Sequence, residues 1–305
     1  MFANYLTITV RNLTRHKLYS LINIFGLSVG IVAGIIALIF IQHETSYDAF
    51  HTKADRTYRI LRERGEGSKR NIRWLTSGDL ARAIESDYPQ IEKASKSRFY
   101  GINVRESGHA WRLQQGHIDA NFLDIFDFPF VAGSRETAFT TPNTVVITEN
   151  AAGRLFGDTD PIGKTITFEE RYYGGDYTIT GVLKQIPKNS SIQFDVLHQT
   201  EPVHEQGIQD WTIWQPRVQN AGIQTFLLLN NDISPSNLES ILPDFIRHHM
   251  GDDARQTITY RLQPLLRWHL YSQADYGTKS AVDSSLMSAE TSIRSRSSLA
   301  SPPSS

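Results

Sequence analysis

The sequence predicts an α+β domain joined to one transmembrane helix, and three observations support this prediction. Residues 21–41 (LINIFGLSVGIVAGIIALIFI) contain no charged side chain. A strand–helix–strand pattern of apolar spacing occurs twice, over residues 56–104 and 226–262. Between these stretches lie short β-like runs broken by turn residues. The order indicates two strand–helix–strand units that flank a β-rich insertion, an α+β arrangement built on a split unit.

The uncharged run has the length of one membrane crossing. As an α-helix it would measure about 31 Å, against roughly 30 Å for the hydrocarbon core of a bilayer. Its apolar residues lie all round the helix, whereas a core helix of a soluble domain normally keeps a polar stripe. The run is too long for the apolar region of a signal peptide, and Gln42-His43-Glu44 is no small-x-small cleavage site. We therefore expect an uncleaved anchor over residues 19–42.

The charges on either side of the anchor predict its orientation. Arg11, Arg15 and Lys17 precede it, and Glu44 and Asp48 follow it. Lysine and arginine concentrate on the cytoplasmic side of a membrane. The N-terminus is therefore expected inside, and everything after the anchor is expected outside the cytoplasm.

Two features indicate what surrounds the membrane segment. Residues 1–18 place apolar and basic residues on different helix faces, which predicts an amphipathic helix at the cytoplasmic interface; a short frayed leader is the alternative. Gly26, Gly30 and Gly34 are spaced four apart within the anchor. Small residues at this spacing favour close packing against a partner helix.

The first strand–helix–strand unit follows the anchor. Around residues 56–62, arginines alternate imperfectly with apolar residues, which indicates a strand with one buried face. Thr76 or Ser77 is expected to cap a helix that ends before Pro89, and residues 93–104 form the next strand.

The insertion has the sequence pattern of a β-rich region. Strands are expected at residues 144–147, 165–168 and 177–183, separated by Gly, Pro, Asn and Asp. Thr148 is expected to cap a short helix that stops at Gly157.

The second unit repeats the pattern of the first. Residues 226–229 form a strand, and Ser234 caps a helix with Pro235 at its first position. This helix is expected to end near Gly251, followed by a strand over residues 256–262.

Composition excludes several classes of function. Among 305 residues, 31 basic and 32 acidic side chains give a formal net charge of −1, so nothing favours binding to nucleic acid. The absence of cysteine excludes disulfides and thiolate metal sites. From residue 280 onward serine dominates and apolar periodicity disappears, which predicts a disordered tail.

No catalytic, cofactor-binding or metal site is predicted, so the chain is not expected to be an enzyme or to need a cofactor. His248 and His249 are adjacent, so on a helix they point in different directions and make a poor metal pair. Gly157-Asp158 and Gly163-Lys164 lack the spacing of a phosphate-binding loop. The aromatic run at residues 121–130 (NFLDIFDFPF) fits core beneath a turn better than the alternative, a ligand groove.

Several stretches taken together resemble the N-terminal part of MacB/FtsX-like ABC transporter permeases, in the form common in Bacteroidota. They are NLTRHKLYSLINIFGLSVGIVAGI (12–35), ETSYDAFHTKADRTYRI (44–60), NFLDIFDFPFVAG (121–133), TVVITENAAGRLFGDTDPIGKTITF (144–168), YTITGVLKQIPKNSSIQFDVL (177–197) and LQPLLRWHLYSQ (262–273). The last stretch resembles the segment that leads back to the membrane.

The resemblance implies a fold and a set of partners. It implies a cytoplasmic amphipathic helix over residues 1–18, a transmembrane helix over residues 19–42 and a MacB-like periplasmic core domain over residues 43–275. Within this domain, the porter-like part covers residues 48–115 and 222–265, and the β-rich insertion covers residues 116–221. Members of the family act as dimers in the inner membrane with a cytoplasmic ABC ATPase. They are thought to pass the motion of the ATPase to the periplasmic domain, which drives export or signalling.

The end of the chain departs from this pattern. Family members continue into three further transmembrane helices, whereas here residues 276–305 form the serine-rich tail. We expect a truncation or frameshift from about residue 278, and a permease subunit without its remaining helices. The alternative function is a single-pass anchored binding module or receptor, and an anchored hydrolase is the third.

Overall fold

A computed structural model describes residues 11, 15–65, 70–170, 173–199 and 223–277. The chain forms two compact units, Met1–Ser46 and Tyr47–Ser305. The predicted helix over residues 1–18 lies mostly outside the described residues, as does nearly all of the predicted tail over residues 276–305.

The first unit contains helix α2 (Lys17–Thr45), which holds the predicted anchor and extends a few residues beyond it at each end. Within the described part of the chain it is the one helix long and apolar enough to cross a membrane. None of its side chains is buried against protein, as expected of a helix whose apolar surface faces lipid.

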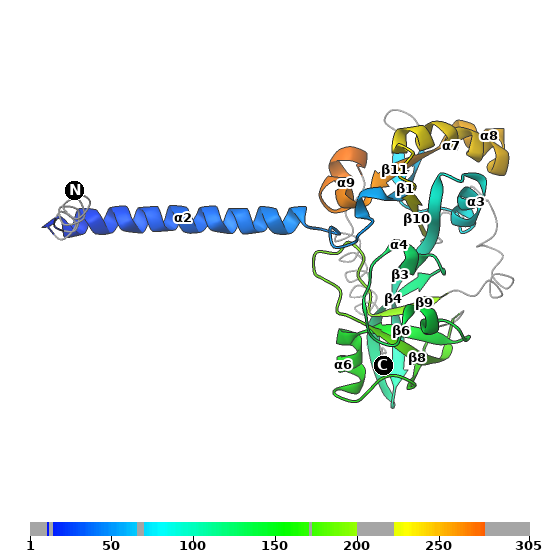
Figure 1. Ribbon diagram of the computed structural model, residues 1–305, viewed down its shortest axis with the longest axis horizontal. Coiled ribbons are helices and arrows are strands. Elements are labelled where there is room, and N and C mark those ends of the chain that lie inside the picture. Colours follow the sequence, from blue (N-terminus) through cyan, green and yellow to red (C-terminus); the bar gives the residue numbers. More distant parts are fainter. Residues whose placement is uncertain (1–10, 12–14, 66–69, 171–172, 200–222, 278–305) are drawn as a thin grey trace, which may run out of the picture. The chain divides into compact units, whose positions relative to one another are not determined.

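The second unit contains both predicted strand–helix–strand units. Their elements are β1 (Thr57–Arg64), α3 (Leu80–Asp87) and β3 (Ile91–Glu106), then β10 (Gln224–Leu229), α7 (Pro235–Met250), α8 (Asp252–Thr257) and β11 (Ile258–Pro264). The four long strands lie in the order β11-β1-β10-β3, with every neighbour antiparallel. This is the order of a split strand–helix–strand fold. Side chains of α3 and α7 belong to one core cluster with the sheet, so both helices cover the same face (Figure 1).

The predicted helix starts were right in two cases and wrong in one. The Thr148 and Ser234 side chains accept hydrogen bonds from the first turns of their helices. Helix α3, however, begins after Asp79. The Thr76 hydroxyl lies 2.7 Å from the Thr225 hydroxyl, because a cap residue near a sheet also finds partners on a neighbouring strand.

The β-rich part is a small closed barrel. It uses the outer half of β3 together with β4 (His109–Ile118), β6 (Thr144–Thr148), β7 (Thr165–Phe168), β8 (Gly175–Leu183) and β9 (Val196–Gln199). The pairings run β3-β4-β9-β6-β8-β7 and return to β3. Closure leaves no free sheet edge in this ring, and apolar side chains fill its interior. The proposed boundary between residues 115 and 116 falls inside β4, which pairs with β3 along its length.

Short elements complete the domain. They are η1 (Ala54–Arg56), β2 (Asn71–Arg73), α4 (Phe122–Ile125), β5 (Phe130–Ala132), α5 (Arg135–Ala138), α6 (Glu149–Phe156), η4 (Leu265–Arg267) and α9 (Trp268–Tyr276).

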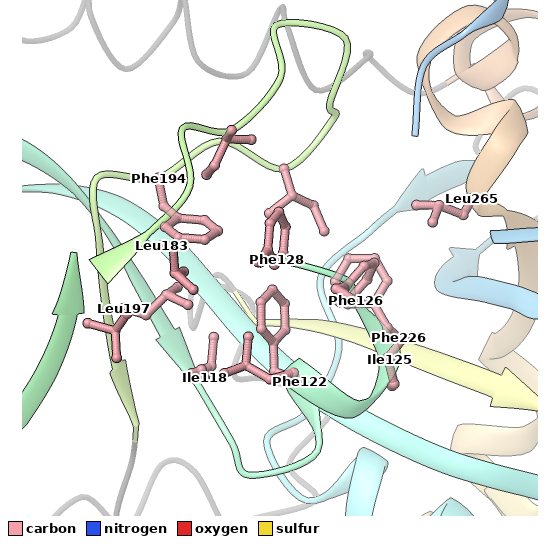
Figure 2. Close-up of a cluster of buried hydrophobic side chains, with 14 of the residues drawn as sticks. Ile118, Phe122, Ile125, Phe126, Phe128, Leu183, Phe194, Leu197, Phe226 and Leu265 are labelled. Carbon is pink, nitrogen blue, oxygen red and sulfur yellow. The ribbon is translucent and has the colours of Figure 1, made fainter. Parts of the chain in front are cut away.

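Strand β10 is buried on both faces and separates two cores. Leu227 and Leu229 face the α3 and α7 side, whereas Phe226 and Leu228 face a second cluster. That cluster contains Phe122, Phe126 and Phe128 of the aromatic run, which Figure 2 shows beside Phe226. The interpretation of this run as core is therefore confirmed.

Strand β1 corrects a second expectation. Its first six residues are all buried, where the sequence predicted one buried face. Arg59 and Arg62 are only 2% and 8% exposed. Arg59 does not mark a solvated face, because η4 and α9 cover the side of β1 on which it lies.

Candidate functional site: a polar cluster where the chain enters and leaves the domain

The first and the last described residues of the second unit lie close together. Tyr47 follows the end of α2 by two residues, and its ring stacks on His269 of α9 with 3.4 Å between ring centroids. Helix α9 follows β11, the last strand among the described residues, through the turn η4. We call the polar side chains around this contact, Asp48, Arg59, Gln263 and Ser272, together with Trp268, the junction cluster.

Arg59 is the centre of the junction cluster. Its Nε and one Nη donate to Gln263 Oε1 at 3.1 and 2.6 Å. Its guanidinium carbon lies 4.1 Å from the centroid of the Trp268 ring, which is a cation–π contact. Burial lowers the pKa of Arg59 to about 9, so the side chain still carries a charge at neutral pH.

Gln263 and Ser272 extend this network into α9. Gln263 Nε2 donates to Ser272 Oγ at 2.8 Å, and Ser272 Oγ donates to the Trp268 carbonyl oxygen. A chain of hydrogen bonds thus runs from β1, through β11, to α9. Buried networks of this kind specify one arrangement of their elements.

Asp48 ties the beginning of the domain to the β-rich part. Its backbone N–H donates to the Asn189 carbonyl oxygen at 2.9 Å, and its Oδ1 accepts from Ser191 N at 2.7 Å. Asn189 and Ser191 belong to the turn between β8 and β9. Burial raises the pKa of Asp48, an effect that hydrogen bonds from Ser191 and Ser190 and the attraction of His269 partly offset.

His51 lies beside the junction cluster among phenylalanine rings. It is 3% exposed, and its Nδ1 accepts a hydrogen bond from Asp127 N at 3.0 Å. The Phe126 and Phe128 rings approach it edge-on, at 5.2 and 5.3 Å between centroids. Burial lowers the pKa of His51 to about 4, and the nearby Asp127 carboxylate only partly opposes this. His51 is therefore neutral at pH 7.

A second polar group lies inside the barrel. His198 Nδ1 and His117 Nε2 are 2.9 Å apart on the paired strands β4 and β9. Burial lowers the pKa of His117 well below its usual range, and His198 adds to the effect. Among the described residues there is no group of three or more His, Asp or Glu side chains placed to hold a metal ion, and this applies both to His117 with His198 and to His248 with His249. His249, the other sequence candidate, bonds Asp87 at 2.6 Å, and the His248 ring stands at 87° to it.

A shallow pocket lies between the barrel and α4–α5. Its volume is about 190 Å³, and it is lined by Asp119, Leu123 and Arg135 among others. Sites for drug-sized ligands usually measure about 300–1,000 Å³. This pocket is therefore small for a site that captures a ligand. The junction cluster, by contrast, has the geometry of a rigid connection.

Sequence reasoning named Asp48 only as a charge that follows the anchor, and it gave no junction residue a structural or functional role. Arg59 and Gln263 are separated by 204 positions, and each looks like an ordinary strand residue in its own segment. The one local signal is a charged residue between apolar neighbours in TYRIL at residues 57–61.

Comparison with known proteins identifies the family. The family model for the MacB-like periplasmic core domain matches residues 20–242. The chain belongs to this family. The predicted resemblance is thereby confirmed, and the chain carries the domain found in MacB-like permeases.

The chain is also similar to individual proteins. The chain is 25% identical over 203 residues to the macrolide export ATP-binding/permease protein MacB of Neisseria gonorrhoeae, covering 64% of this chain and 30% of that protein. The chain thus spans less than a third of the curated relatives it matches. A domain of a putative permease from Porphyromonas gingivalis is 25% identical with a TM-score of 0.57, over 70% of this chain and 92% of that one. The periplasmic region of MacB from Actinobacillus actinomycetemcomitans is 12% identical with a TM-score of 0.47, over 70% and 90%.

Proposed function

We propose that this chain is a permease component of an ABC-type system that exports a substrate or transmits motion across the inner membrane. Its N-terminus lies in the cytoplasm and its domain in the periplasm. It works as a homodimer with a cytoplasmic ABC ATPase. The family assignment, the apolar helix α2 and the basic residues before it support this proposal.

The junction cluster carries the proposal. A domain that receives motion from membrane segments needs a stiff connection at the point where the chain reaches the bilayer. Here the residues that follow α2 and the helix that ends the domain are locked together through Tyr47, Arg59 and Gln263. A displacement that reaches Tyr47 is therefore expected to move β1 and α9 together, since packed interiors transmit strain.

Orientation is testable because the chain has no cysteine of its own. Single-cysteine variants R15C and A110C place one thiol before the anchor and one at the start of strand β4, both at exposed positions. We expect a membrane-impermeant maleimide to label A110C in intact spheroplasts, and R15C only after permeabilisation. The opposite labelling pattern would refute the proposed orientation.

Partnership with an ATPase requires a separate experiment. The full chain is crosslinked in its native membrane, purified, and assayed for MgATP hydrolysis, with proteins identified by mass spectrometry. We expect an ABC ATPase in near-stoichiometric amount and a second copy of the chain. A preparation that contains neither would refute the permease proposal in favour of an anchored binding module.

A further inference from the structure

A small pocket at the C-terminal end of strand β1 is lined by arginines. Its volume is about 160 Å³, and its lining residues are Arg62 and Arg64 of β1 with Asn71 and Arg73 of β2. Positions 62 and 73 lie directly opposite each other on the paired strands, as do positions 64 and 71. Side chains that are directly opposite in antiparallel strands lie on the same face of the sheet. We call these four residues the arginine pocket.

The acidic residue in this part of β1 lies on the other face of the sheet. Glu63 stands between Arg62 and Arg64, and successive side chains of a strand point to opposite faces. Its carboxylate pairs with Arg70 and with Arg261 of β11, at 3.0 Å from Arg261 Nε. The charge of Glu63 is therefore matched away from the arginine pocket.

Arg62 carries a buried charge beside like charges. The residue is only 8% exposed. Burial lowers the pKa of Arg62, and the charges of Arg64 and Arg73 lower it further, against the attraction of Tyr260. Like charges directly opposite each other on neighbouring strands are destabilising, and a buried charge is costly unless it is paired. Arrangements that cost stability in this way are expected at functional sites.

Arg73 is oriented by a neutral group. Its Nε donates to Asn71 Oδ1 at 3.0 Å, and both residues are exposed, so a solute reaches this side of the pocket. The hydrogen bond fixes the guanidinium plane without neutralising its charge. A guanidinium has further N–H donors on its Nη atoms, and the amide nitrogen of Asn71 can donate as well. The lining thus offers hydrogen-bond donors and positive charge to a ligand.

We propose that the arginine pocket binds a phosphate group. Guanidinium groups hold phosphate oxygens through paired, charge-assisted hydrogen bonds, and a phosphate dianion would offset two of the three positive charges. The volume suits so small a group, since sites for drug-sized ligands usually measure about 300–1,000 Å³. The phosphate belongs either to a soluble ester or to a lipid headgroup. This inference depends neither on the orientation of the anchor nor on the partnership with an ATPase.

Protection of Arg73 from phenylglyoxal, which modifies guanidinium groups, tests the proposal. The full chain in detergent micelles is modified at increasing concentrations of inorganic phosphate and constant ionic strength, and mass spectrometry gives the rate at each arginine. At a phosphate concentration ten times the dissociation constant, modification of Arg73 should slow about tenfold. Arg247, which pairs with Asp244 and has 51% of its side chain exposed, is the internal control and should change by less than about twofold.

Three variants assign the protection to the pocket. Arg62→Met removes the buried charge, and Asn71→Ala, at an exposed position where folding is not at risk, removes the group that orients Arg73. Each should raise the phosphate concentration for half-protection of Arg73, by about tenfold or more for Arg62→Met, since hydrogen bonds to charged groups are worth about 1.5–3 kcal/mol. Arg105→Gln, which removes an exposed positive charge in the barrel part, should leave that concentration unchanged.

A second set of measurements distinguishes the two sources of phosphate. The full chain is placed in phosphatidylcholine nanodiscs with or without phosphatidic acid. Protection of Arg73 by phosphatidic acid without added phosphate would identify a lipid headgroup. Protection by glycerol phosphate in phosphatidylcholine discs, with none from phosphatidic acid, would identify a soluble ester.

Four results would overturn the proposal. Arg73 is protected neither by phosphate nor by phosphatidic acid, or Arg73 and Arg247 are protected equally, which would mean general screening of charge. Half-protection occurs at the wild-type phosphate concentration in both Arg62→Met and Asn71→Ala. A hexaglutamate peptide protects Arg73 at a lower concentration than phosphate does, which would assign the pocket to carboxylates of a protein partner.

Discussion

Replacement of Gln263 by leucine is the sharpest test of the junction cluster. Gln263 Oε1 accepts both hydrogen bonds that Arg59 makes to it, and the glutamine is completely buried. Leucine has a similar volume but no acceptor. The substitution therefore leaves a buried guanidinium beside an apolar side chain, although the Trp268 ring still lies against it and the Asp48 carboxylate still attracts it.

The expected loss of stability follows from the cost of leaving a buried charge without its hydrogen-bond acceptor. Each hydrogen bond to a charged group is worth about 1.5–3 kcal/mol, and breaking a buried charged pair from one side costs about 3–5 kcal/mol. We expect Gln263→Leu to lower the free energy of unfolding by about 3 kcal/mol. The double variant Arg59→Met/Gln263→Leu removes the charge as well, and should lie within about 1 kcal/mol of the wild type, since apolar side chains of similar volume often replace buried ionic groups without loss.

The assay is urea denaturation of the full chain in detergent micelles, followed by tryptophan fluorescence. Trp268 reports directly, because Arg59 lies against its ring. Arg82→Met is the matched control: this arginine pairs with Asp79 at the surface, with 77% of its side chain exposed. We expect the control to change stability by less than about 0.5 kcal/mol. The reasoning is refuted if Gln263→Leu behaves like the control, or if the double variant is as unstable as the single one.

Three further predictions concern other parts of the domain. As the pH falls from about 6.5 to about 4, the free energy of unfolding should drop by roughly 3 kcal/mol through His51, because the unfolded chain binds this proton more readily than the folded one; urea titrations at several pH values measure it. Gly133→Ala should lower the free energy of unfolding by at least about 2 kcal/mol, because φ of Gly133 is +73° and an added Cβ would collide with the Thr180 carbonyl oxygen. Gly153→Ala, in open space on α6, should instead raise the free energy of unfolding by about 0.5–1 kcal/mol. Ser234→Ala should cost about 1 kcal/mol through loss of the α7 cap, measured by the same denaturation.

Each of these predictions has its own control. His51→Gln should abolish the pH-dependent loss, whereas His109→Gln, at an exposed position, should leave it intact; a loss that survives His51→Gln disproves the assignment. Equal effects of alanine at Gly133 and Gly153 would contradict the backbone argument. Ser234→Asp retains a capping oxygen and should remain within a few tenths of a kcal/mol of the wild type; destabilisation as large as that of alanine would exclude capping as the cause.

Much of the local structure was predictable because its causes lie within a few residues. The apolar run of α2 has no charge to place in lipid. The helix starts at Thr148 and Ser234 follow from a side-chain oxygen that reaches the next turn. The aromatic run at residues 121–130 was predicted as core, since phenylalanine contributes more by burial than by any other interaction. The cap at Thr76 failed because its hydroxyl bonds a residue almost 150 positions away.

The sequence by itself therefore determined that this chain has an apolar anchor and two strand–helix–strand units with a β-rich insertion. Only the tertiary structure decided that β7 returns to β3 and closes the barrel, and that Arg59 is buried at the point where the chain enters and leaves the domain. The physical reason is the same in both cases. Strand pairing and burial of a charge depend on partners more than 60 and 200 residues away, and the alternation of side chains within one strand carries no information about which distant strand or helix will cover it.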